Sequence, residues 1–461
     1  MASRCSTSTT DSGLALMSHV DTEMLAAQSA DSSSAPAVAF ITLGCAKNEV
    51  DSADMLSRVR EAGYRIVEDV EMADAVIVNT CSFIQEATEE SLNAIFELSG
   101  LPGFDSGERK IVVAGCMPAR YGSQLEGELT EASAFVPCSK EDDIVDVLTE
   151  LVGRPSAPDG IESSCDGDVY PAAYAKISDG CDRFCAFCAI PFIRGGYHSF
   201  PLEQIRSKVA KLVASGVREI TLIAQDTGRW GEDFTPRDTT AHLLSSLAEE
   251  FTTTWFRLMY IEPVGVTDEL LDVIAKYDNV CKYLDMPLQH ASARVLKNMN
   301  RSGSLEENLA LVACIRARVP GITLRTTVMV GFPGETEEEF QELLTMLEEA
   351  EFDYVGAFAF SPEEGTKAAK MPDQIDEEIK AERLQEVRDL ADAISFARVA
   401  TRVGTKQQVL VLGYEDDGQL YGRAMCQAPD VDGVTYLASG EVGEVVELQI
   451  EDALLYEMEG V

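Results

Sequence analysis

Three cysteines in the middle of this 461-residue chain, Cys181, Cys185 and Cys188, are spaced as CxxxCxxC. Thiolates with this spacing can bind one iron–sulfur cluster, and three of them leave one of its four corners without a protein ligand. Structural zinc sites, by contrast, are normally closed by four protein ligands. The motif therefore predicts a cluster with one iron free to bind a substrate or a cofactor.

A second set of three cysteines, Cys45, Cys81 and Cys116, lies upstream. Each cysteine comes just after a continuous β-branched apolar run, which is typical of a strand buried on both faces of a parallel sheet. Successive cysteines are 36 and 35 residues apart, about the length of one strand and one helix. The carboxyl ends of parallel strands meet in one crevice, so we expect the three thiols to converge. The predicted strands are 38–43, 75–79 and 110–114, with helices over 51–62 and 84–98.

The central part of the chain alternates strands with helices, which predicts a parallel sheet curled towards an open, partial barrel. In barrels of this class the carboxyl ends of the strands carry the site. Gly331 and Gly334 follow one predicted strand and would let the backbone approach a ligand closely. The expected strands are 174–177, 219–224, 255–261, 283–288, 323–330 and 354–360.

Short strands punctuated by glycine follow from about residue 400 and predict a small all-β barrel. Residues 400–461 contain three basic and twelve acidic residues, a net charge of −9. An RNA-binding barrel would need basic residues and stacking aromatics, so direct RNA binding is disfavoured. The predicted strands are 407–412, 419–423, 434–437 and 445–450.

Composition indicates a multi-domain cytoplasmic protein. No apolar run approaches the ~20 residues that cross a bilayer, so no membrane association is expected. Twelve cysteines in irregular spacing favour a reducing compartment in which thiols serve metals. The net charge of −42 favours a basic partner over a polyanion. Residues 1–35 are expected to form a disordered N-terminal extension. The six cysteines outside the two sets are predicted to be packing residues: Cys5, Cys138, Cys165, Cys281, Cys314 and Cys426.

The cluster motif and its flanks resemble those of the radical S-adenosylmethionine (radical SAM) methylthiotransferases. The similarity rests on residues 177–181, 184–191 and 193–195, on the text around the upstream cysteines, and on a C-terminal barrel placed like a TRAM domain. Within the family, the chain is most similar to the branch that modifies a ribosomal protein, although His198, Ser199 and Phe200 stand where that branch commonly has basic residues. The resemblance implies an α/β chain with three domains. These are an open parallel methylthiotransferase domain (36–150), a partial (β/α)6 TIM-like radical SAM core (167–398) and an OB-like TRAM domain (400–461).

The same resemblance implies the chemistry. Two 4Fe–4S clusters would be held by the two cysteine sets. The downstream cluster would coordinate S-adenosylmethionine and cleave it reductively to a radical, and the upstream cluster would carry the sulfur to be inserted. Phe187 is a candidate wall of the S-adenosylmethionine site, and no catalytic residue is predicted beyond the cluster cysteines. The product would be an aspartate methylthiolated at its β-carbon in the twelfth protein of the small ribosomal subunit. A second S-adenosylmethionine, a reductant protein and a sulfur donor would also be needed.

Two alternatives remain from the sequence. A MiaB-type enzyme that methylthiolates adenosine in tRNA would share both clusters and the fold, but the acidic C-terminal barrel disfavours it. A non-catalytic metal-binding adaptor with zinc in both cysteine sets is disfavoured by the odd number of ligands in each set.

Overall fold

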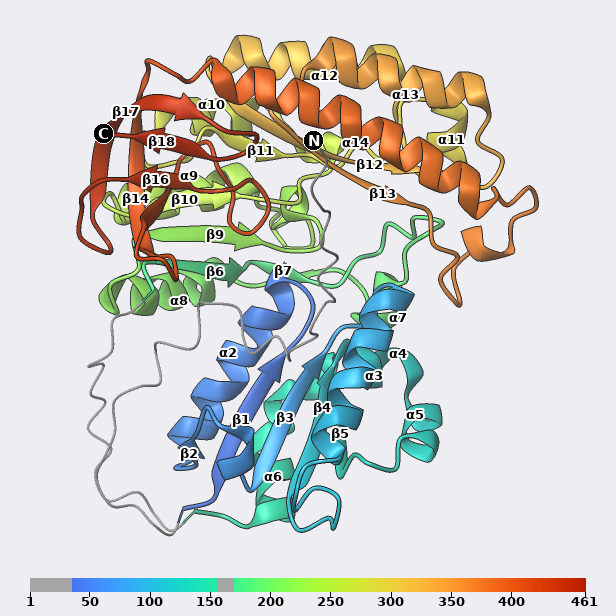
Figure 1. Cartoon of the computed structure of the whole chain (residues 1–461), viewed down its shortest axis with the longest axis vertical. Coiled ribbons are helices and arrows are strands. Elements are labelled where there is room, and N and C mark those ends of the chain that lie inside the picture. Colours follow the sequence, from blue (N-terminus) through green and yellow to red (C-terminus); the bar gives the residue numbers. More distant parts are fainter. Residues whose placement is uncertain (1–34, 156–169) are drawn as a thin grey trace, which may run out of the picture.

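The computed structural model describes residues 35–155 and 170–461, which form three domains in chain order (Figure 1). The extension predicted for residues 1–35 lies almost entirely outside the described residues, as do Cys5 and Cys165. Within these ranges, no helix is both long enough and apolar enough to cross a membrane.

The N-terminal domain is built on a five-stranded parallel sheet in the order β2-β1-β3-β4-β5. Successive residues of β1 pack in different hydrophobic clusters: Val38 and Phe40 enter one, and Ala39 and Ile41 enter the other. Burial on both faces explains the continuous apolar runs. The strands are β1 (Ala37–Thr42), β2 (Arg65–Ile66), β3 (Ala75–Thr80), β4 (Lys110–Gly115) and β5 (Ala134–Pro137).

Helices cover this sheet and connect its strands. They are α2 (Ala46–Glu61), α3 (Gln85–Ser99), α4 (Cys116–Tyr121), α5 (Ser123–Glu128) and α6 (Ile144–Val152). The three predicted strands and two predicted helices are present. The short strands β2 and β5 were not predicted, and α2 begins five residues earlier than expected. The arrows of β1, β3 and β4 point towards the central domain in Figure 1.

The central domain contains the six predicted strands, arranged as two three-stranded parallel sheets in the orders β10-β9-β6 and β11-β12-β13. A parallel bridge between Phe256 and Val280 links the two halves, which gives the open barrel that the alternating pattern predicts. The strands are β6 (Ala172–Lys176), β9 (Glu219–Ile223), β10 (Trp255–Leu258), β11 (Tyr283–Asp285), β12 (Thr323–Val330) and β13 (Tyr354–Ala359).

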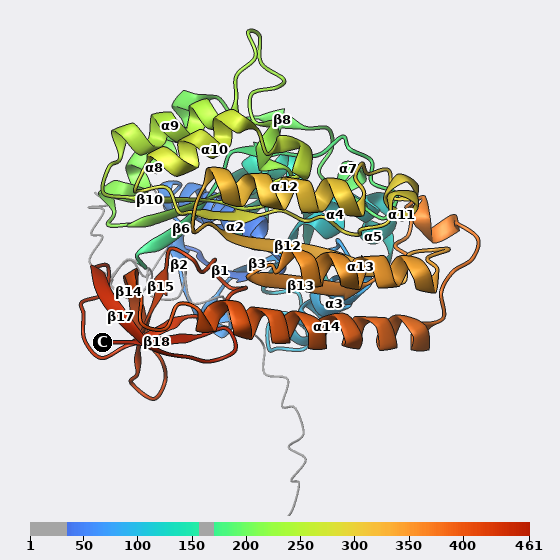
Figure 2. The ribbon, with the colours of Figure 1, turned by 90° about the horizontal axis from the view of Figure 1, so that it is seen from above.

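Helices follow these strands on the outer surface, and α12, α13 and α14 lie side by side in Figure 2. They are α8 (Leu202–Ala214), α9 (Thr240–Glu250), α10 (Asp268–Lys276), α11 (Ala293–Asn298), α12 (Leu305–Arg318), α13 (Glu337–Ala350) and α14 (Glu377–Ala400). The segment between β6 and α8 carries the CxxxCxxC motif. It is bounded by the small hairpin of β7 (Ser178–Asp179) and β8 (His198–Ser199) and contains α7 (Ile190–Ile193).

The C-terminal domain is a closed five-stranded barrel in the order β14-β15-β16-β18-β17, carried at the end of α14 (Figure 2). The four predicted strands are present, and the short last strand adds a fifth. The strands are β14 (Lys406–Tyr414), β15 (Leu420–Ala424), β16 (Thr435–Leu437), β17 (Val445–Ala453) and β18 (Met458–Gly460).

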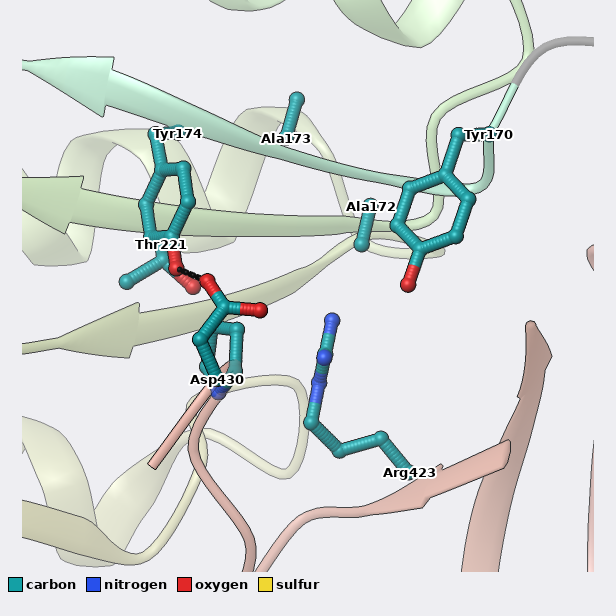
Figure 3. Close-up of a pocket in the computed structure, with 8 residues that line it drawn as sticks. Tyr170, Ala172, Ala173, Tyr174, Thr221, Arg423 and Asp430 are labelled. Atoms are coloured by element: carbon teal, nitrogen blue, oxygen red, sulfur yellow. Dashed lines mark hydrogen bonds between the residues drawn. The ribbon is translucent and has the colours of Figure 1, made fainter. Parts of the chain in front are cut away.

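The C-terminal barrel shares a hydrophobic cluster with the central barrel and with α2, in which Tyr283 and Tyr354 pack with Val409 and Met458. Polar contacts reinforce this seam. Figure 3 shows a small cavity along it, where the Tyr174 hydroxyl donates a 2.5 Å hydrogen bond to Asp430. The carboxyl-end half of the central barrel is left to face the N-terminal domain.

Candidate active site

The three upstream cysteines lie together at the carboxyl edge of the N-terminal sheet. Cys45 caps the start of α2 after β1, Cys81 follows β3, and Cys116 begins α4 after β4. Gly44 has a φ of +104°, and a Cβ there would come within 2.5 Å of the Cys81 Cβ. Glycine therefore precedes Cys45 because the backbone at residue 44 passes too close to the Cys81 side chain for any other residue.

Two asparagines brace this edge. The Asn48 side chain donates to the Thr80 carbonyl at 2.9 Å, and the Asn79 side chain donates to the Asn48 carbonyl at 2.9 Å. The Asn48 Oδ1 in turn accepts a 3.6 Å hydrogen bond from the Cys45 thiol. The loops after β1 and β3 are therefore held in one arrangement by buried polar contacts.

A fourth thiol, Cys138, lies at this edge and was predicted from sequence to be an ordinary packing residue. Its Sγ is 4.0 Å from the Cys116 Sγ. The pairing of β4 with β5 explains this short distance. Gly115 and Pro137, the last residues of the two strands, are paired, so Cys116 and Cys138 follow at neighbouring positions of the same sheet edge. Because β5 was not predicted, the sequence offered no signal that Cys138 would join the other three.

The downstream cysteines lie on the loop after β7, pinned by backbone contacts. The Cys181 amide donates to the Gly195 carbonyl at 3.1 Å, and the Ala186 amide donates to the Met299 carbonyl at 2.9 Å. Gly180 has a φ of +74°, and a Cβ there would be 2.3 Å from the Gly196 carbonyl oxygen. The motif is thus held both by the end of its own loop and by the segment after α11.

The Arg301 side chain places a positive charge beside the downstream thiols. Its guanidinium donates to the Cys185 Sγ at 3.6 Å, to the Pro287 carbonyl at 2.7 Å, and to Glu262. Burial raises the pKa of Cys188 to about 12. A buried thiol keeps its proton until a metal displaces it, and a nearby guanidinium favours the resulting thiolate.

In the upstream set, too, burial raises the pKa of a thiol and a guanidinium lies close to a thiol. Burial raises the pKa of Cys81 to about 12, and the neighbouring thiols Cys116 and Cys45 add to the rise. The Arg194 guanidinium donates to the Cys116 Sγ at 3.6 Å. Arg194 belongs to the downstream motif region, so one side chain of the central domain contacts a thiol of the N-terminal domain.

Four buried charged side chains lie between the two cysteine sets. Lys176 contacts Asp51 at 2.5 Å and Asp179 at 2.7 Å, and Arg194 contacts the same two carboxylates at 2.8 and 3.3 Å. Burial alone would raise the pKa of Asp179, but Lys176 and Arg194 hold it at about 2. Two cations and two anions therefore neutralise each other between the domains, as buried charges require.

Both candidate donor sets consist of thiols alone, which are the ligands that iron–sulfur clusters use. Among the residues described, no three His, Cys, Asp or Glu side chains stand close enough together to hold one metal ion. A four-iron cluster binds each thiolate at a different iron, so its ligands stand farther apart than those of one tetrahedral zinc. Cys45, Cys81 and Cys116 would hold one such group, and Cys181, Cys185 and Cys188 the other.

The remaining predicted site residues lie near the downstream loop. Phe187 is half-buried and packs against a cluster that includes Phe332 and Phe360. Gly331 has a φ of +72°, and a Cβ there would come within 2.4 Å of the Lys380 stem. Gly334 has a φ of +76°, and a Cβ there would lie 3.9 Å from the Arg294 guanidinium, an ordinary contact distance. Gly331 thus has a packing reason to be glycine, and its contact with a cofactor stays a prediction.

Three family models match consecutive parts of the chain. The first, described as an uncharacterized protein family, UPF0004, matches residues 37–137. The radical SAM superfamily matches residues 175–347, and the TRAM domain matches residues 403–461.

Relatives that match along nearly the whole chain include two RimO enzymes. The ribosomal protein uS12 methylthiotransferase RimO of Geobacter sulfurreducens is 42% identical over 437 residues, covering 92% of this chain and 98% of its own. The RimO of Syntrophomonas wolfei is 38% identical over 442 residues, covering 92% and 99%. The chain belongs to the RimO family. It is therefore a radical SAM methylthiotransferase, an enzyme that transfers a sulfur group, and the superfamily match supports an iron–sulfur cluster and S-adenosylmethionine as cofactors.

Solved structures agree on the fold. The radical S-adenosylmethionine methyltransferase TsrM of Kitasatospora setae, bound to tryptophan and an S-adenosylmethionine analogue, has a TM-score of 0.52 at 14% identity, covering 70% of this chain and 73% of its own. The cobalamin-dependent radical enzyme OxsB has a TM-score of 0.50 at 13% identity, covering 77% and 56%.

Proposed function

We propose that this enzyme methylthiolates the β-carbon of one aspartate in ribosomal protein uS12, using two molecules of S-adenosylmethionine and a sulfur donor. The observation that supports this most strongly is the 42% identity to a RimO along 98% of that protein. The geometry is compatible, since two separate cysteine sets face each other where the N-terminal sheet meets the barrel.

Two 4Fe–4S clusters are proposed, one for each set. At Cys181, Cys185 and Cys188 the cluster would supply the electron that cleaves S-adenosylmethionine, and at Cys45, Cys81 and Cys116 the cluster would carry the inserted sulfur. The chain's own residues would do the rest: Arg301 and Arg194 favour the thiolates, Phe187 would shield the cofactor, and Gly331 and Gly334 would let the backbone approach it. A reductant protein would supply electrons in the cytoplasm.

Charge supports a basic protein as the substrate. The C-terminal barrel has a net charge of −9 and the chain −42. Docking on RNA would have to overcome repulsion, whereas a ribosomal protein rich in lysine and arginine would be steered towards the enzyme. Direct RNA binding is therefore disfavoured, and the seam with the central barrel leaves the outer face of the C-terminal barrel available for docking.

The experiment that tests this proposal compares two substrates in one reaction. Anaerobically reconstituted enzyme would be incubated with S-adenosylmethionine, sulfide, reductant, small ribosomal subunits and bulk tRNA, followed by mass spectrometry of both. The expected result is a methylthio group on one aspartate of uS12 and unmodified tRNA. Methylthioadenosine in tRNA with unmodified uS12 would establish the MiaB-type activity instead.

A further inference from the structure

Lys47 reaches from the N-terminal domain into the mouth of the central barrel. It lies in the first turn of α2, two residues after Cys45, and its Nζ is 3.2 Å from the centroid of the Tyr260 ring. Tyr260 follows β10 at the carboxyl end of the barrel, where its amide donates to Asp285 at 3.1 Å. The ammonium group therefore stands between the upstream cysteines and the barrel interior.

This ammonium has no hydrogen bond or ion pair within residues 35–155 and 170–461, although carboxylates are near. Asp285 is engaged by Arg325 at 3.0 Å, and Asp179 is engaged by Lys176 and Arg194. The contrast with Lys176, which binds two carboxylates, is informative. A half-buried cation whose contact is one aromatic face is held in place without being neutralised, so an incoming anion would be favoured there.

We propose that the Lys47 ammonium receives the carboxylate of the substrate aspartate; this inference rests on the proposed function. The carbon to be methylthiolated is bonded directly to that carboxyl carbon, so the cation that binds the carboxylate also places the reacting carbon. From Lys47, that position lies beside Cys45, where the sulfur would be delivered. The amino end of the 16-residue α2 adds partial positive charge to the same place.

The proposal makes Lys47 a specificity residue. A charge-assisted hydrogen bond is roughly twice as strong as a neutral one, so aspartate should be preferred over the isosteric asparagine. The ring of Tyr260 would fix the ammonium before the substrate arrives, which reduces the entropy lost on binding. A neutral base such as adenine gains nothing comparable from this half-buried ammonium.

The test measures binding of purified uS12 that carries aspartate or asparagine at the modified position. Reconstituted wild-type enzyme should bind the aspartate form about tenfold more tightly, the scale of one hydrogen bond to a charged group. Lys47→Met keeps the side-chain length and removes the charge, so the two forms should bind equally. Lys47→Arg should keep the preference, and Lys211→Met, which removes an exposed lysine on α8, should behave as wild type.

Iron content should be unchanged in all three variants, and Lys211→Met should also cleave S-adenosylmethionine as the wild type does. A full preference for aspartate in Lys47→Met would overturn the proposal, as would equal binding of both forms by the wild type. If Lys47→Met loses iron, Lys47→Arg decides, because loss of the preference in that variant at normal iron content contradicts a charge-based role. Modification of tRNA by the wild type would instead contradict the proposed function.

Discussion

The seam between the central and C-terminal barrels depends on one buried carboxylate, Glu219, and replacing it with glutamine should weaken that seam. Glu219 accepts 2.8 Å hydrogen bonds from Arg257 of β10 and from Arg423 of β15. Glu219 and Arg257 are fully buried, and Arg423 is nearly so. Glutamine has the same shape and no charge, so the variant leaves two guanidinium groups facing each other in the interior.

Breaking a buried ion pair by removing one partner costs ~3–5 kcal/mol, because an uncompensated charge stays behind. Glu203→Gln is the matched control, because Glu203 pairs with Arg206 on the exposed surface of α8. A surface pair of this kind contributes about 0–1 kcal/mol. The two variants should therefore differ by several kcal/mol although each neutralises a single carboxylate.

Urea unfolding followed by tryptophan fluorescence would measure the difference, because Trp255 lies in the hydrophobic cluster that both barrels share. Hydrogen exchange over β14–β18 would show whether the C-terminal barrel loosens. Burial alone would raise the pKa of Glu219, but Arg423 and Arg257 lower it below its ordinary value. The carboxylate's contribution is thus complete above the unfolded pKa and lost as the pH falls through the folded pKa, so the cost should stay constant from pH 6 to 8. A cost for Glu219→Gln no larger than that for Glu203→Gln would refute this reasoning.

The remaining predictions concern the clusters and docking. Changing Cys181, Cys185 and Cys188 together to alanine should remove about half of the iron from the reconstituted protein, because we propose that the upstream set binds its own cluster; stoichiometric zinc without iron-dependent visible absorbance would contradict both assignments. Cys45→Ala should abolish sulfur insertion while reductive cleavage of S-adenosylmethionine persists, and Cys185→Ala should abolish both; normal thiolation by the first variant would argue against a sulfur-carrying upstream cluster. Asp416→Lys with Asp417→Lys, on the exposed turn between β14 and β15, should weaken uS12 binding most at low salt and leave the iron content unchanged. If the variant bound uS12 as tightly as the wild type at every salt concentration, this turn would be excluded from the docking surface.

The convergence of Cys45, Cys81 and Cys116 could be predicted because it follows from parallel topology alone. Long β-branched runs identify strands buried on both faces, and each such strand delivers its last residue to the same edge. Cys138 reaches the same edge and was missed, because β5 is a four-residue strand ending in proline and carries no comparable pattern. Short strands are defined by their neighbours in the sheet rather than by their own sequence.

The charges around the site could not be predicted for a different reason. Asp51 and Lys176 are separated by 125 residues and belong to different domains, so no spacing rule connects them. Lys47 and Arg194 both lie in segments whose sequence resembles that of the family. Sequence similarity, however, does not show which groups a side chain contacts. For Gly331, the sequence predicted that a ligand approaches the backbone, and this stays a prediction; the group that lies close to Gly331 in the structure is the Lys380 stem.

The buried charges between the domains bear on how two cysteine sets can serve one reaction. Arg194 contacts Asp179, which lies two residues before Cys181, and it also contacts Asp51 and the Cys116 thiol of the other domain. Separating the domains would take Asp51 away from Lys176 and Arg194 and would take Arg194 away from the Cys116 thiol, while both cations would keep their contacts with Asp179. These contacts therefore favour one arrangement of the two cysteine sets before any substrate binds. The proposed role of Lys47 places the substrate aspartate at this same interface, because the Lys47 ammonium contacts the Tyr260 ring of the central domain.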